Sequence, residues 1–218
     1  MNIQDMLLGD IPKIKTSVDI IFVLDSSNPY DYEEVILSFV EKLCFNYEKN
    51  KHKPDKIRMD VVWHNTNENS VVFDRMGFAE IEGDTSVIQT YFRDLENIKC
   101  NKNVTAMEAL DEALKSKWNC DGDRLRHIII LITDHPDPID EKHLMDFYLD
   151  WDSAKCLGSQ PGEDGWGKYK WLSNKGKRLV LVAPNVFPYD EMGIVMENAI
   201  LYDKKLMGVK QDGWENFG

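Results

Sequence analysis

Apolar and polar residues follow two periods along the chain, and these periods predict strands that alternate with helices. Three stretches read as apolar runs rich in β-branched residues, a pattern typical of strands buried on both faces of a parallel sheet. They are Val18 to Leu24, His127 to Thr133 and Arg178 to Ala183, and Asn198 to Tyr202 reads as a last strand. Apolar residues at helical spacing predict helices over Tyr30 to Tyr47, Thr85 to Leu95, Thr105 to Lys117, Glu141 to Leu149 and Tyr189 to Met196.

One departure from this alternation predicts an antiparallel strand at the edge of the sheet. Ile57 to Trp63 and Ser70 to Phe73 are strand-like and are separated by HNTNEN, whose asparagines favour turns. We expect these two runs to form a β-hairpin. The predicted fold class is therefore α/β, with a doubly wound, mainly parallel central sheet, one antiparallel edge strand and helices on both faces.

Length and composition are those of a single globular domain. A chain of 218 residues with 43% hydrophobic content can bury a sizeable core. We expect an N-terminal extension over residues 1–17, one domain over 18–203 and a polar tail over 204–218. A long connector at about 135–177 carries the aromatic residues Trp151, Trp166, Tyr169 and Trp171. These aromatic residues either cover the sheet or anchor a partner protein.

Charge and cysteine usage limit the partners and the compartment. The formal charge of −12 opposes binding to nucleic acid and to anionic membrane surfaces. No apolar run approaches the roughly 20 residues of a membrane helix, and the N-terminus lacks the layout of a secretory signal. The four cysteines are widely spaced, which favours a reducing compartment over a disulfide framework. The predicted location is cytoplasmic.

Four oxygen-bearing residues stand where predicted strands end or a helix begins. Asp25 and Ser27 follow the first strand, Thr105 opens a helix, and Asp134 follows the strand that ends at Thr133. The carboxyl ends of parallel strands form the usual ligand crevice of an open α/β sheet, so we expect the four side chains to converge there. Four hard oxygen donors suit a divalent cation.

These residues and their order resemble the von Willebrand factor type A (VWA) domain over most of the chain. That family has a metal ion-dependent adhesion site built from Asp-x-Ser-x-Ser, a distant Thr and a distant Asp. Asp25 and Ser27 match the first two positions, Thr105 the Thr, and Asp134 the last Asp. Pro29 stands where the second Ser would be and has no side-chain oxygen. The resemblance implies a Mg²⁺ site at these four residues.

The resemblance also implies a function without catalysis. Members of the family bind proteins, and an acidic side chain of the partner completes the coordination of the metal. Asp25 would orient metal-bound water. We therefore expect a protein-binding module or adaptor that recognises its partner at the carboxyl ends of the strands.

An enzyme is the alternative, with Asp25 as a phosphoryl-accepting nucleophile in a phosphatase or phosphoryl-transfer reaction. The haloacid dehalogenase-like pattern needs a second Asp two residues further on, where this chain has Ser27. The chain also lacks the phosphate-binding loop that ends in Gly-Lys-Ser/Thr and the Gly-x-Ser-x-Gly nucleophile elbow.

Several of these residues also have structural explanations. Asp25 can end a strand and cap a helix, and Thr105 with Glu108 matches a capping box. Asp137 and Asp140 either enlarge an acidic patch near Asp134 or serve as turn residues beside proline, and we favour the turn. His127, His135 and His143 would bind zinc only if they converged on one point.

Overall fold

The core of the protein is a seven-stranded, mainly parallel sheet. The computed structural model describes residues 14–25, 32–50, 54–64, 74–81, 85–95, 106–153 and 176–203. The predicted tail, most of the N-terminal extension and the aromatic residues Trp166, Tyr169 and Trp171 lie outside these ranges. The predicted domain limits therefore stay predictions.

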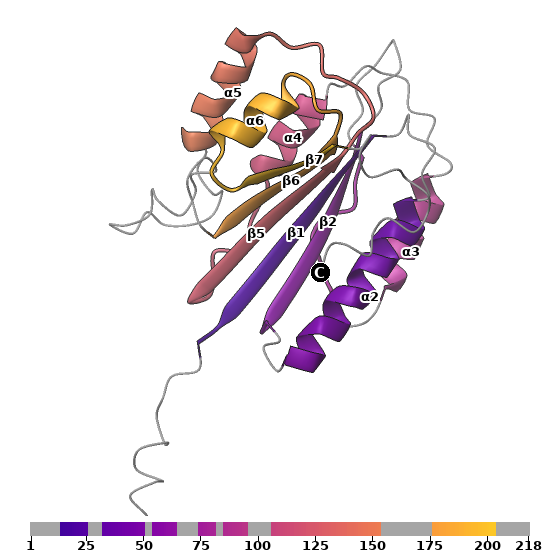
Figure 1. Ribbon diagram of the computed structural model, residues 1–218. Coiled ribbons are helices and arrows are strands. Elements are labelled where there is room, and N and C mark those ends of the chain that lie inside the picture. The colour runs from indigo at the N-terminus through magenta and orange to yellow at the C-terminus, as the bar shows by residue number, and fades with distance from the viewer. Residues whose placement is uncertain are drawn as a thin grey trace, which may run out of the picture.

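Five strands run parallel through the sheet (Figure 1). They are β1 (Thr16–Asp25), β2 (Lys56–His64), β5 (Arg124–Ile132), β6 (Lys177–Ala183) and β7 (Ala199–Asp203). The order across the sheet is β3-β2-β1-β5-β6-β7, so β1 lies between β2 and β5. Nine of the ten residues of β1 are buried, as expected for a central strand that helices cover on both faces. The strands predicted from apolar runs are confirmed.

The antiparallel edge lies beside β2 and is split into two short strands. β3 (Asp74–Arg75) and β4 (Ala79–Glu80) both pair with β2 in the antiparallel direction. Gly77 lies between them with φ of +78°, a conformation that glycine adopts without strain. The predicted edge is confirmed, although Ser70 to Phe73, its expected strand, lies outside the described residues. His64, expected in the turn, is instead the last residue of β2.

Helices cover both faces of the sheet (Figure 1). α2 (Tyr32–Asn50) and α3 (Ser86–Leu95) pack on one face, and α4 (Ala106–Leu114), α5 (Glu141–Ser153) and α6 (Tyr189–Val195) contribute to the core on the other. The residues of β1 alternate between these two cores because successive side chains of a strand point to opposite faces. Ile21 and Val23 pack in the core with α4, whereas Ile20 and Phe22 pack in the core with α2. The predicted doubly wound arrangement is confirmed.

Candidate binding site at the carboxyl ends of the strands

Asp25 and Asp134 follow neighbouring parallel strands and lie at the same end of the sheet. Asp25 is the last residue of β1, and Asp134 comes two residues after the end of β5. Leu24 pairs with Ile132, so Asp25 and Thr133 continue these two strands side by side. The hydroxyl of Thr133 donates a hydrogen bond of 2.9 Å to Oδ2 of Asp25. The structure thus places two of the four predicted metal ligands at the same end of the sheet.

Asp25 is fully buried, with 0% of its surface exposed. A buried carboxylate is costly unless donors satisfy it, and Thr133 supplies one of them. The hydroxyl of Tyr32, at the start of α2, donates a hydrogen bond of 3.0 Å to the backbone carbonyl of Asp25. β1 and α2 are therefore joined where the loop between them begins.

The other two predicted ligands, Ser27 and Thr105, lie outside the described residues, as does Pro29. Within the described ranges, no group of three or more His, Cys, Asp or Glu side chains could hold a metal ion. The convergence of all four ligands and the presence of Mg²⁺ therefore stay predictions. The capping box also stays a prediction, because Glu108 is described and Thr105 is not.

Asp137 has a role that the sequence did not reveal. We expected a turn residue, but Asp137 is buried and its Oδ2 accepts a hydrogen bond of 2.9 Å from the backbone N–H of Met107, in the first turn of α4. Burial raises the pKa of Asp137 to about 6, against the opposing effect of the backbone donors around it. The loop after β5 is thereby joined to the start of α4.

Tyr189 is close enough to Asp137 and Asp25 for both charges to act on its hydroxyl. It is the first residue of α6, is fully buried, and donates a hydrogen bond of 3.3 Å to the backbone carbonyl of His135. Burial raises the pKa of Tyr189, and the negative charges of Asp137 and Asp25 raise it further. The phenol is therefore protonated at neutral pH and can donate its hydrogen bond to the His135 carbonyl.

His64 completes this end of the sheet. It is the last residue of β2, is fully buried and pairs in register with Asp25. His64, like Asp25, comes directly after a predicted strand, but the asparagine-rich sequence that follows it suggested a turn. We refer to Asp25, His64, Thr133, Asp134, Asp137 and Tyr189 together as the strand-end cluster.

The three histidines considered for zinc lie in separate places. His127 is in the first half of β5, where it stacks on Trp118 at 4.8 Å between ring centroids. Burial lowers the pKa of His127 to about 4, so its ring is neutral at pH 7. His143 lies on α5, where its Nδ1 is 2.6 Å from Oδ1 of Asp140. His135 follows Asp134 in the loop after β5.

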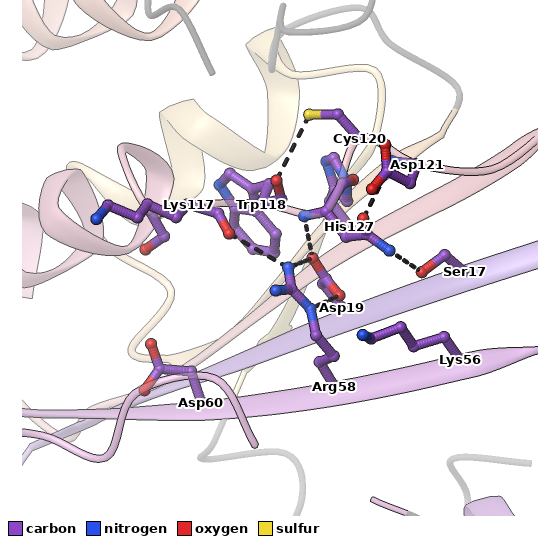
Figure 2. A network of polar contacts seen from close by, with 12 residues as sticks. Ser17, Asp19, Lys56, Arg58, Asp60, Lys117, Trp118, Cys120, Asp121 and His127 are labelled. Atoms are coloured by element: carbon purple, nitrogen blue, oxygen red, sulfur yellow. Dashed lines mark hydrogen bonds and ion pairs between the residues drawn. The ribbon is translucent and has the colours of Figure 1, made fainter. Parts of the chain in front are cut away.

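A second polar network crosses the first half of the strands (Figure 2). Asp19 of β1 is 1% exposed and accepts two hydrogen bonds from the guanidinium of Arg58, at 2.9 and 2.5 Å. The backbone N–H of Asn119 donates a third hydrogen bond to Asp19, and the Asn119 side chain donates to Ser17. The hydrogen bond with Asp19 raises the pKa of Arg58, so the guanidinium stays positively charged. We refer to Ser17, Asp19, Arg58, Asn119 and His127 as the Asp19 network.

The neighbouring part of the sheet contains a second ion pair, in which the carboxylate is buried and the guanidinium is partly exposed. Arg75 of β3 binds Asp60 of β2, whose other oxygen accepts a hydrogen bond of 2.8 Å from the backbone N–H of Gly77. Burial raises the pKa of Asp60, and Arg75 opposes this change. Arg75 also donates to Ser116, just after α4. The split edge of the sheet is thus held by charged side chains.

Comparison with solved structures finds alignments at low sequence identity. No family model and no curated protein matches the sequence. A mutant of the PilB minor pilin from Streptococcus sanguinis aligns over 88% of this chain, with a TM-score of 0.49 and 12% identity. This chain covers 57% of that pilin chain. The VWA domain of SpRpn10 aligns over 87% of each chain, with a TM-score of 0.46 and 11% identity.

The class of protein follows from the sheet itself. A mainly parallel sheet with an antiparallel edge and helices on both faces defines a doubly wound α/β protein and fits the VWA-like fold that the sequence motifs imply. Among the described residues, no helix combines the length and the apolar character needed to cross a membrane.

Proposed function

We propose that this chain is a non-enzymatic protein-binding module or adaptor that recognises its partner at the strand-end cluster. The observation that supports the proposal most is the placement of Asp25 and Asp134, which come from two separate VWA-like motifs and lie at the ends of adjacent parallel strands. In open α/β sheets, ligands usually bind at the carboxyl ends of the strands. Buried and partly buried carboxylates there favour a ligand that carries positive charge or hydrogen-bond donors.

Mg²⁺ is the cofactor that this donor set fits. Asp25, Ser27, Thr105 and Asp134 would hold the ion, and all of them offer hard oxygen atoms. Mg²⁺ retains several waters in protein sites, so a further water can stand where Pro29 offers no side-chain oxygen. The ion would supply a positive charge to which an acidic side chain of a partner protein binds.

The buried state of Asp25 favours binding over catalysis. A nucleophilic carboxylate must reach its substrate, whereas Asp25 has 0% of its surface exposed and accepts a hydrogen bond from Thr133. Asp25-dependent hydrolysis of a generic phosphomonoester would reverse this preference.

Titration calorimetry of the metal-stripped protein with MgCl₂ and MnCl₂ tests the metal site. We expect saturable binding by the natural chain and binding at least about tenfold weaker in Asp134→Ala. Asp146→Ala, which removes an exposed acidic residue from α5, is the matched control and should bind as the natural chain does. Equal binding by all three proteins would show that the metal is not held at the strand-end cluster.

Selection from a random displayed-peptide library tests protein binding directly. The library is selected on the natural chain in Mg²⁺ and in EDTA, and on Asp134→Ala in Mg²⁺. Enrichment of Asp- or Glu-containing peptides only on the natural chain in Mg²⁺ would support recognition through an acidic side chain. Enrichment that survives both EDTA and Asp134→Ala would place recognition on another surface.

A further inference from the structure

Asp137 is more deeply buried and less fully satisfied than a turn residue needs to be. Its exposed fraction is 6%, and Oδ2 accepts the hydrogen bond from Met107. The other oxygen, Oδ1, is buried and has no hydrogen-bond partner among the residues that the structure describes. Asn or Ser would cap a helix about as well without the cost of a buried charge. The carboxylate at this position therefore does more than satisfy a backbone N–H at the start of α4.

The opposite end of α4 is held by the charged networks near the first half of the strands (Figure 2). Arg75 donates to the Ser116 hydroxyl at 2.6 Å, and Arg58 donates to the Lys117 carbonyl at 3.2 Å. The next residues, Trp118 and Asn119, are bound to the end of α4 and to Asp19 respectively. With this end fixed to the sheet, the position of the first turn of α4 depends on what holds the helix near Met107.

We infer that Asp137 is a positioning residue of the strand-end cluster, which fixes the first turn of α4 against the loop that carries Asp134 and presents its second oxygen to the ligand. The inference deepens the proposed function and rests on it. The hydrogen bond to Met107 spans 30 residues of sequence and joins the segment after β5 to the helix expected to begin at Thr105. Asp137 thus sets the spacing between two sides of the predicted metal site.

Asp140 provides a matched control from the same loop. Its Oδ1 accepts a hydrogen bond of 2.9 Å from the backbone N–H of His143, in the first turn of α5. Asp140 is exposed, whereas Asp137 is buried. Asp140→Ala therefore removes an aspartate that caps a helix without disturbing the first turn of α4.

The first measurement is hydrogen–deuterium exchange of the full chain in metal-free buffer, followed by mass spectrometry. In Asp137→Ala we expect faster exchange in the first turn of α4 and in residues 133–140, with unchanged exchange around Ser116. Asp137→Asn keeps an oxygen that can accept from Met107 and should restore most of the protection. Asp140→Ala should leave α4 unchanged. If exchange in α4 is the same in Asp137→Ala as in the natural chain, the inference is wrong.

The second measurement is calorimetric titration of the same four proteins with Mn²⁺. Asp137→Ala should bind at least about tenfold more weakly, as for residues that orient metal ligands. Asp137→Asn should also bind more weakly, although it restores protection of α4, because its amide nitrogen cannot replace the second oxygen that Asp137 presents to the ligand. Faster exchange with unchanged Mn²⁺ affinity in Asp137→Ala would mean a purely structural cap and would overturn the inference. If the natural chain itself binds no Mn²⁺, the metal part of the proposed function fails. In that case the exchange measurement alone decides whether Asp137 positions the first turn of α4 and residues 133–140.

Discussion

Replacing Asp137 by Asn should change how the stability of the protein depends on pH. The carboxyl group is buried next to Tyr189 and the start of α4, and burial raises its pKa from the ordinary 3.8 to about 6. Asp137→Asn keeps the shape of the side chain and a hydrogen-bond acceptor for Met107 but removes the ionisable group. The difference in unfolding free energy between the two proteins therefore isolates the titration of this one residue.

The size and sign of the effect follow from the shift in pKa. A shift of about two units corresponds to about 3 kcal/mol. Well below pH 4 the carboxyl is protonated in both the folded and the unfolded chain, so burial carries no ionisation cost. Above about pH 6 it is ionised in both states, and the folded state bears the full cost. The contribution of Asp137 to the unfolding free energy should thus fall by about 3 kcal/mol as the pH rises between these values.

Urea denaturation at several pH values from 4 to 7.5, at constant ionic strength and with EDTA, measures this difference. The advantage of Asp137→Asn over the natural chain should grow by about 2 to 3 kcal/mol across the range. Asp140→Asn is the control, because hydrogen bonds from His143 lower the pKa of Asp140 and its titration therefore lies below about pH 4. Its difference from the natural chain should stay nearly flat between pH 4 and 7.5. A difference that is flat with pH for Asp137→Asn would refute the argument that burial controls this carboxyl group.

Three further substitutions test the packing and the polar networks by urea denaturation at pH 7. Arg58→Met should destabilise the fold by about 3–5 kcal/mol because it leaves buried Asp19 without its cation, and a loss below about 1 kcal/mol would contradict this. Thr133→Val should cost about 1–3 kcal/mol by removing a donor to Asp25, and Thr133→Ser should recover most of it; equal losses in both would point to packing instead. Leu110 of α4 is buried in the core, so Leu110→Ala should lower the free energy of unfolding by about 2–5 kcal/mol; a neutral result would mean that α4 does not pack as described.

The sequence predicts the centre of the sheet well and its edge less well. Long apolar runs identify β1, β5 and β6 because parallel strands are covered on both faces and tolerate few polar residues. β3 contains only Asp74 and Arg75, and nothing in its own sequence marks it as a strand. Arg75 lies in the sheet because it binds Asp60, which is 15 residues earlier in the chain. Local periodicity cannot report such a pairing.

The position of a residue at the end of a predicted strand identifies only part of the candidate site. Asp25 and Asp134 follow long buried strands, so the sequence alone predicts that they lie at the same end of the sheet. Asp137 escapes this reasoning because its partner, Met107, lies 30 residues away and its neighbouring prolines resemble an ordinary turn. Asp19 escapes it for a related reason. It interrupts the first apolar run, and its partner Arg58 is 39 residues away.

The ion pair between Asp19 and Arg58 has a consequence for how the strands find their alignment. β1 is apolar on both faces from Ile20 to Leu24, so hydrophobic burial alone would accept several shifted pairings with β2. In the observed register Asp19 faces Arg58; a slide of two residues in one direction would face it with Asp60, and two buried carboxylates would repel each other. A slide the other way would face Asp19 with Lys56 and would leave Arg58 without its acceptor. The charged pair therefore penalises misaligned pairings of β1 with β2 that apolar side chains alone would tolerate.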